Sequence, residues 1–201
     1  MAINVNNAFV GTPPIDGGVY YNAPVGTPLP EDTTGVLDEA MADHGAIGPD
    51  GFTVTPTRTS TTEKMFGGGD FIDMQTEYTQ DFSITFLEDD NDNVIATSFG
   101  DNNYTKSEAT AENGTKRTIY HTDQQLPIKS HVLRAASGEK RKTYVIPRGR
   151  ITTVEKTPDV HTGSTKTTVT GKCFKSPDPA HKGAYVIEYR DDGVTTETAG
   201  A

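Results

Sequence analysis

The stretch from Asp70 to Glu88, DFIDMQTEYTQDFSITFLE, decides the fold class of this chain. It contains no Gly, Pro or Asn, and its polar and apolar side chains alternate. A period of two is typical of a β-strand with one face in a core and the other in water. The apolar face is predicted to hold Ile72, Met74, Thr76, Tyr78, Phe82, Ile84 and Phe86. The wet face is acidic and holds no base, and its members are Asp73, Gln75, Glu77, Thr79, Asp81, Ser83 and Thr85. Because the alternation of polar and apolar positions keeps the same phase from Asp70 to Glu88, we expect one long bent strand or two strands in register.

A short helix is predicted directly after this strand. The acidic run EDDND at 88–92 precedes the apolar segment VIATSF at 94–99, and Gly100 follows. Acidic residues favour the N-terminus of a helix, and glycine is a common residue just past its end. Ile95 and Phe99 are four positions apart, so both can face the core. We expect a helix of about two or three turns at ~3.6 residues per turn.

Most of the remaining chain shows strand patterns separated by turn residues. Further strands are predicted at 52–58, 61–66, 116–121, 129–136, 140–146, 151–156, 165–174 and 185–189. Ser137-Gly138-Glu139 is predicted to be a hairpin turn, and Pro147 to end a strand. Many short strands with one flanking helix indicate a mainly β fold, a two-sheet antiparallel sandwich or barrel.

The chain is predicted to form one domain with two extensions. Residues 1–35 contain ten Gly or Pro and are interpreted as an extended amino-terminal arm with one short strand at 19–21, or as a disordered terminus. Residues 36–190 form the β domain, within which the polar segment 101–114 is predicted to be a long loop without structure. Residues 191–201 are a polar carboxy-terminal tail.

The fraction of hydrophobic residues is low for a compact monomer. Only 33% of the 201 residues are hydrophobic and Trp is absent, which suits a thin sandwich with long loops or a subunit that completes its burial by assembling. No apolar run approaches the ~20 residues of a membrane helix, and the start lacks the features of a secretory signal. We therefore expect no membrane association. The lone Cys173 is expected to pack as a small buried hydrophobe.

Charge is divided unevenly along the chain. Residues 1–100 hold 16 acidic and two basic residues, a net charge of −14, whereas residues 101–201 hold 12 acidic and 16 basic residues, a net charge of +4. This division is consistent with charged residues that are spread unevenly over a surface facing water and have no further role. It is also consistent with a head-to-tail interface, in which an acidic flank meets a basic flank of the next copy.

One group of basic residues could form such a flank, or could touch phosphates. Its members are Arg134, Lys140, Arg141, Lys142, Arg148 and Arg150. The net charge of −10 argues against stable nucleic-acid binding. We therefore interpret this group as a docking surface for a neighbouring subunit.

No motif in the sequence supports catalysis, a metal or a cofactor. The five histidines do not stand at metal-ligand spacing, and a surface position is expected for each of His44, His121, His131, His161 and His181. The acidic run fails as a calcium loop because a loop starting at Asp89 would place Val94 and Gly100 at its sixth and twelfth positions. No nucleophile elbow or phosphate loop occurs. An enzyme is the least expected class.

The order and spacing of several blocks resemble a known family. These blocks are FGGGD at 66–70 before the long strand, FGD at 99–101 after the helix, Ile146-Pro147, and NNAFVGTPPIDGGVYY at 6–21. Together they resemble the major tail protein, or tail tube subunit, of long-tailed non-contractile bacteriophages, above all those of actinobacterial phages. The resemblance covers almost the whole chain, although no single motif in it is specific.

The resemblance implies a structural protein whose hexameric rings stack into a tube through which the genome passes. It implies the phage tail tube fold, assembly in the host cytoplasm and a final location in the virion. The implied partners are further copies of the chain, with tape measure, tail terminator and distal tail proteins. The alternatives are a single-ring tail component, such as a distal tail or tail terminator protein, and a secreted β-sandwich binding module.

The acidic face of the long strand is a candidate for the wall of such a tube. An acidic and hydroxyl-rich wall repels phosphate, so a duplex could slide past it without binding. The residues predicted to face the lumen are Asp73, Gln75, Glu77, Asp81 and Ser83. The same face could instead lie on the outer surface.

Overall fold

The structure is a computed structural model that describes residues 3–14 and 18–195. The described chain is mainly β, with antiparallel pairing throughout and one α-helix, as predicted. The strands are β1 (Tyr20–Pro24), β2 (Ala42–Asp43), β3 (Ile47–Lys64), β4 (Asp70–Phe86), β5 (Tyr104–Ser107), β6 (Lys116–Ile119), β7 (Lys129–Ser137), β8 (Lys140–Lys156), β9 (Thr167–Cys173) and β10 (Ile187–Asp191). The helix is α1 (Asp92–Phe99), and short 3-10 turns lie at η1 (Val5–Asn7), η2 (Asp101–Asn103) and η3 (Pro179–His181).

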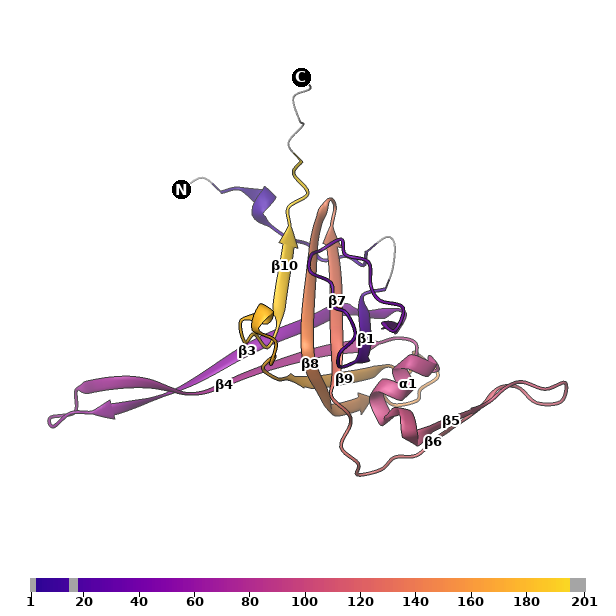
Figure 1. The fold of residues 1–201 in the computed structure, drawn as a ribbon. Helices are drawn as coiled ribbons and strands as arrows, with labels where there is room; N and C mark the ends of the chain where they lie inside the picture. The colour runs from indigo at the N-terminus through magenta and orange to yellow at the C-terminus, as the bar shows by residue number, and fades with distance from the viewer. Residues whose placement is uncertain (1–2, 15–17, 196–201) are drawn as a thin grey trace, which may run out of the picture.

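Two layers cross at β8. The main sheet has eight strands in the order β2-β1-β7-β8-β9-β4-β3, with β10 also paired to β8. The first half of β8 pairs with β7 and β10, and its second half pairs with β9. In Figure 1, β7, β8 and β10 stand upright side by side, with β8 antiparallel to the other two, while β3 and β4 lie across them. The predicted sandwich is therefore formed, with β8 shared between its two layers.

Two predicted breaks between strands are absent. The segments predicted at 140–146 and 151–156 form the single strand β8, which continues through Pro147. Proline is tolerated there because the β7–β8 register shifts between the pairs Lys129↔Gly149 and His131↔Ile146, so Pro147 lies in a bulge without a ladder partner. The segments predicted at 52–58 and 61–66 likewise form one strand, β3.

The main core lies between the two layers. Phe82, Ile84 and Phe86 of β4 are at most 2% exposed, in agreement with the predicted alternation in this half of the strand. Gly171 on the paired strand β9 leaves room for the Phe82 ring, because a Cβ at that position would lie 2.4 Å from it. Cys173 is buried as predicted, and burial raises the pKa of its thiol to about 12.

The predicted boundary between the arm and the β domain at residue 35 is wrong, because the second half of the arm belongs to the β domain. Tyr20–Pro24 forms β1, which pairs with β7, and Tyr20 is completely buried in the main core. The chain after β1 covers the outer face of this layer, where Leu29 and Leu37 pack against a second apolar cluster. An aromatic or aliphatic side chain that reaches a core outweighs the local Gly and Pro content. Residues 1–2, 15–17 and 196–201 of the predicted extensions lie outside the described residues.

The helix forms as predicted. Asn91 caps it by accepting a hydrogen bond from the Asn93 backbone N–H at 3.0 Å, and Gly100 ends it with a φ of +94°. Ile95 is buried in the core, whereas Phe99 is only half-buried and lies 4.5 Å from the His121 ring. The helix therefore covers one end of the layers.

Two of the five histidines are core residues, so the prediction of surface positions is wrong for them. His44 and His131 are 0% and 1% exposed. His44 Nδ1 donates to the Ala42 carbonyl oxygen at 2.9 Å, and its Nε2 lies 2.8 Å from the Thr97 hydroxyl. His131 Nδ1 lies 2.7 Å from the Tyr20 hydroxyl. Hydrogen-bond partners allow these polar rings to be buried, which a one-dimensional pattern does not reveal.

The predicted unstructured loop at 101–114 is also wrong in its first half. Residues 101–107 form η2 and β5, and β5 pairs with β6 to make a second two-stranded sheet. In Figure 1 this ribbon projects from the helix side of the molecule. Its base is held by the Asp92 carboxylate, which accepts hydrogen bonds from Tyr104 Oη at 2.6 Å and Arg117 Nε at 2.7 Å. These hydrogen bonds lower the pKa of the Asp92 carboxyl, and the bond from Tyr104 has the largest effect.

Candidate assembly surfaces

The β3–β4 hairpin is the most prominent surface feature. Its outer half, residues 55–64 of β3 and 70–77 of β4, is exposed on both faces. Figure 1 shows it as a long twisted ribbon projecting away from the two layers. Gly67 and Gly68 form its turn with φ values of +97° and +90°, which glycine adopts without strain. The glycine-rich block at 66–70 therefore contains a hairpin turn.

A bulge interrupts the β3–β4 ladder within this exposed half of the hairpin. The ladder passes from Thr59↔Glu77 to Ser60↔Gln75, so Thr76 is an extra residue in β4. The Thr76 hydroxyl donates to the Thr59 carbonyl oxygen at 3.1 Å. Since directly opposed residues share a face and β3 alternates, Glu77 and Gln75 lie on opposite faces of the ribbon.

The bulge divides the residues of the predicted lumen face between the two faces of β4. Glu77, Asp81 and Ser83 stay on one face of β4, but Gln75 and Asp73 lie on the other. The prediction assumed a phase kept from end to end, whereas one extra residue inverts every side chain beyond it.

The neighbouring strands also change the charge of this face. Asp81 is directly opposite Lys172 on β9, and Lys172 is opposite Arg150 on β8. Ser83 Oγ accepts a hydrogen bond from the Thr170 hydroxyl at 3.3 Å. The strand by itself has no base on its polar face, but the sheet places two cations beside it.

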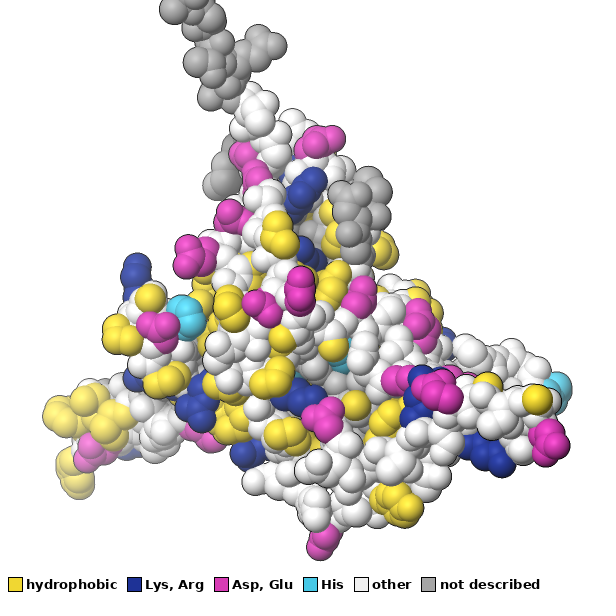
Figure 2. All heavy atoms as spheres, turned by 45° about the vertical axis from the view of Figure 1, so that its right-hand side comes forward, with side chains coloured by type: hydrophobic (Ala, Val, Ile, Leu, Met, Phe, Trp, Pro, Cys, Tyr) yellow, Lys and Arg dark blue, Asp and Glu magenta, His cyan; other side chains and the backbone are white. Residues whose placement is uncertain are grey.

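The end of the hairpin carries an exposed apolar patch. Phe66 at the turn is fully exposed, and Phe71 is 70% exposed. We call the following set the tip patch: Met65, Phe66, Phe71, Ile72 and Met74. Figure 2 shows hydrophobic side chains gathered at the end of this projection. Since Ile72 and Met74 lie beyond the bulge, they are on the ribbon face opposite to that of the core residues Phe82 and Ile84.

The six predicted docking cations do not form one cluster. Arg134, Lys140, Arg141 and Lys142 lie at or near the β7–β8 turn, whereas Arg148 and Arg150 lie after the bulge at Pro147. Sequence proximity suggested one surface, but β8 is long enough to carry its two ends into different layers.

Part of the basic group binds other segments of the same chain, including its described amino-terminal residues. Lys140 Nζ donates to the carbonyl oxygens of Asn6 and Ala8, the latter at 3.1 Å, and Lys142 Nζ lies 4.0 Å from the Phe9 ring centroid. Arg134 donates to the Gly35 carbonyl oxygen. Arg141 remains exposed. Cations at this end therefore hold the chain's own segments and also line its surface.

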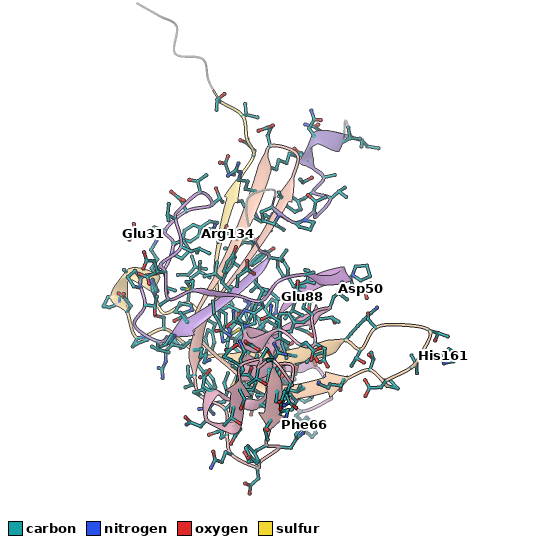
Figure 3. All side chains as sticks on the ribbon, turned by 90° about the vertical axis from the view of Figure 1, so that its right-hand side faces the viewer. Glu31, Asp50, Phe66, Glu88, Arg134 and His161 are labelled. Carbon is teal, nitrogen blue, oxygen red and sulfur yellow. The ribbon has the colours of Figure 1, made fainter. Side chains whose placement is uncertain are left out.

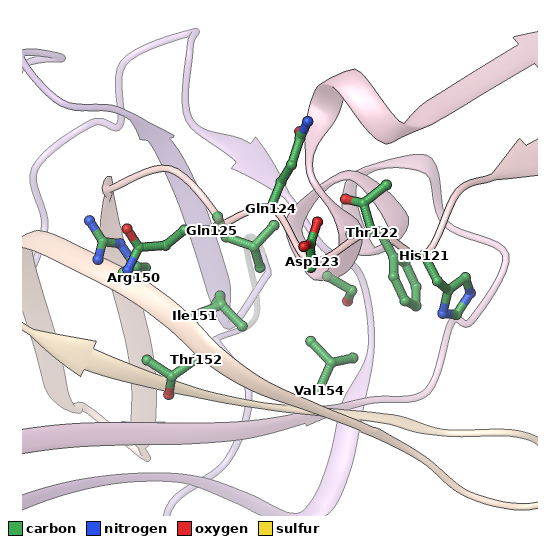
Figure 4. A pocket seen from close by; sticks show the side chains of 12 residues that line it. His121, Thr122, Asp123, Gln124, Gln125, Arg150, Ile151, Thr152 and Val154 are labelled. Carbon is green, nitrogen blue, oxygen red and sulfur yellow. The ribbon is translucent and has the colours of Figure 1, made fainter.

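A depression beside the helix has no catalytic arrangement. It has a volume of 470 Å³ and lies between the end of α1, residues 121–126 and the second half of β8 (Figure 4). Its floor includes Ile151 and Val154, and the buried Ser98 hydroxyl beside it has no partner among the described residues. His121 and Asp123 line it without a hydrogen bond to each other, so they do not form an acid–base pair.

Within residues 3–14 and 18–195, no cluster of His, Cys, Asp or Glu has the arrangement of a metal site. Three acids of the run at 88–92 have other partners: Glu88 accepts a hydrogen bond from the Ala46 backbone N–H, Asp89 pairs with Lys156 at 2.7 Å, and Asp92 holds the β5–β6 ribbon. None of the helices in the described part of the chain has the length and hydrophobicity to cross a membrane.

No protein-family model and no curated protein matches the chain. Among solved structures, it is similar to a chain in the cryo-EM structure of an extracellular contractile injection system, the PVC sheath–tube complex in its extended state. The alignment covers 92% of this chain and 94% of that chain, with 6% sequence identity and a TM-score of 0.40. A likeness at this level assigns neither a family nor a function.

Proposed function

We propose that this chain is a structural subunit that assembles with further copies of itself into the tube of a phage tail, and that it is not an enzyme. The observation that carries the proposal is the tip patch on the outer half of the β3–β4 hairpin. A two-stranded ribbon is marginally stable by itself, and a contiguous exposed apolar patch is typical of an interaction site. Contact with a neighbouring copy would stabilise the ribbon and cover the patch.

The open edge of the sheet supports the same proposal. β3 is the last strand in the order of the main sheet, so along its length one edge faces no further strand of the described chain. Unpaired edge groups favour pairing with another chain. Joining such edges around a ring would remove them. The sequence resemblance adds the finer detail, namely hexameric rings, their stacking, a virion location, and tape measure, tail terminator and distal tail proteins as partners.

The bore of this tube would be lined by the polar face of β4 from Glu77 to Ser83, on the body side of the bulge. Glu77 and Asp81 on this face repel phosphate, and hydroxyls such as that of Ser83 keep it hydrated. Lys172 beside Asp81 and Arg150 beside Lys172 balance the charges of Glu77 and Asp81, so the face has no net positive charge. DNA would pass over such a wall without stable binding.

Self-association is tested by electron microscopy and sedimentation of the concentrated protein. We expect tubes of stacked rings for the unmodified chain. Phe66→Asp with Phe71→Asp should raise the concentration needed for assembly at least about tenfold, since buried interface aromatics are typical hot spots. The thermal midpoint should hardly change, because exposed substitutions usually alter stability by about 0.5 kcal/mol or less.

Val160→Asp is the matched control, because Val160 is a 52% exposed apolar residue away from the hairpin. It should leave assembly unchanged. Lone rings would indicate a single-ring tail component. A protein that stays monomeric at every concentration would contradict the proposal and favour a binding module.

The bore assignment predicts a separate defect. Glu77→Lys with Asp81→Lys should leave tubes intact but slow DNA ejection at least about tenfold, because each cation facing the bore gains counterion-release affinity for phosphate. The control, Glu39→Lys with Glu112→Lys, makes the same charge change at two exposed positions elsewhere. Ejection from phage carrying each pair is followed by the release of labelled DNA. Unchanged ejection for the first pair would place this face outside the bore.

A further inference from the structure

We propose that the tip patch of one copy seats in a groove at the opposite end of β3 in a second copy. This contact rests on the self-assembly proposed above and identifies its acceptor surface. We call the acceptor the Phe52 groove, and its main lining residues are Phe9, Ile47, Phe52, Arg134, Lys142 and Tyr144.

The Phe52 groove is a hollow of 470 Å³ between residues 9–13, the start of β3, and strands β7 and β8. Its wall is aromatic: the Phe52 and Tyr144 rings meet edge to face at 5.5 Å. A second hollow of 320 Å³ adjoins it, since both are lined by Arg134 and Lys142, and this hollow adds Arg141. The combined surface therefore offers apolar rings bordered by cations.

Charge and polarity match between the two surfaces. Residues 53–77 of the hairpin hold four acidic and two basic residues, a net charge of −2. The groove and its adjoining hollow hold Arg134, Arg141 and Lys142 against Asp50, a net charge of +2. Aromatic and Arg side chains dominate the energy of protein interfaces, and opposite charge guides association and register.

The two surfaces cannot meet within one copy. Phe52 and Phe66 are joined by β3, which is extended, so at ~3.3 Å per residue they are about 45 Å apart. In Figure 3, Phe66 at the hairpin end is well separated from Asp50 and Arg134 beside the groove. The bulge also turns Ile72 and Met74 to the face opposite to that of the chain's own core residues.

A contact between two different patches is heterologous. After one such contact, the pair still has one free tip and one free groove, so the contact propagates and closes into a ring or continues as a filament. A single pair of surfaces is sufficient to drive growth.

The acceptor is tested by photo-cross-linking from the tip. A photoreactive phenylalanine analogue replaces Phe66, and labelled and unlabelled copies are mixed so that cross-links between copies can be recognised by mass. We expect cross-links between copies to peptides spanning 47–52 or 134–144. Cross-links between copies to other regions would overturn the groove while leaving self-assembly intact. A monomer with no such cross-links would overturn both.

A charge exchange gives an independent readout that does not depend on the probe. Arg141→Glu with Lys142→Glu in the groove, and Glu63→Lys with Asp73→Lys in the hairpin, should each weaken association about tenfold. A chain carrying all four substitutions should recover to within about threefold of the unmodified protein, because the opposed charges are restored. Failure of the combined chain to recover, with circular dichroism showing it folded, would overturn the proposed pairing.

Discussion

The free energy of unfolding should fall by about 4 kcal/mol when the pH is lowered from 7 to 5, because two histidines are buried in neutral form. Burial lowers the pKa of His44 to about 3 and that of His131 to about 4. The nearby charge that acts on both is the cation Lys129, which lowers each pKa further. Within residues 3–14 and 18–195, no carboxylate is among the groups that shift either pKa.

The direction of this effect follows from proton uptake. An unfolded histidine has a pKa of about 6.5, so between about pH 6.5 and 4 the unfolded state binds more protons than the folded one. Stability is therefore complete above about pH 6.5 and is lost on acidification. At pH 5 each histidine contributes about 2 kcal/mol of this loss.

Urea unfolding at pH 7, 6 and 5 measures the effect. His131→Gln lowers stability at every pH but should remove about half of the pH dependence, because one of the two titrating groups is gone. His161→Gln, at an exposed position, is the control and should leave the pH dependence unchanged. Equal unfolding midpoints at pH 7 and 5 would show that these rings titrate normally, and so are not buried as described.

Tyr20→Ala should lower the free energy of unfolding by about 4 kcal/mol, as for other large aromatic core residues. Tyr20 is 0% exposed, and its ring lies 4.6 Å from that of His44 and 5.3 Å from that of Phe86. Its hydroxyl is also the partner of His131 Nδ1 at 2.7 Å. The substitution therefore opens a cavity and leaves a buried imidazole without its partner.

Thermal and urea unfolding of the monomer at pH 7 check this loss. Tyr120→Ala is the matched control, because Tyr120 is 55% exposed, and it should change stability by about 0.5 kcal/mol or less. A small effect of Tyr20→Ala would mean that the segment around it is a detachable arm, as its Gly and Pro content suggested.

Local signals predicted several elements well. Alternation over residues 78–86 identified a half-buried strand, since β pleating forces a period of two whatever the partner strand is. The acidic run and Gly100 bounded α1 to within one or two residues, because capping depends only on neighbours along the chain. The turn at Gly138 and the burial of Cys173 were also predicted, because both follow from residue type and near neighbours in the sequence.

The candidate site was predicted less well, because its properties depend on pairs of strands. The predicted lumen face needed a continuous register, and the extra residue Thr76 divided it. The predicted basic surface needed adjacent positions to stay together, but Arg148 and Arg150 follow the bulge at Pro147. The tip patch was within the alternating stretch, yet nothing local distinguishes Met74, which is exposed, from Phe82, which is buried.

Residue types and their spacing along one strand or one helical turn account for the β class, the position of the helix, the turns and the division of charge. The packed fold was needed to show that Tyr20, His44 and His131 share a core, that Lys172 lies beside Asp81, and that the hairpin extends beyond the cover of the described chain. Burial, register and cross-strand neighbours are properties of several segments packed together, so no single stretch of sequence encodes them.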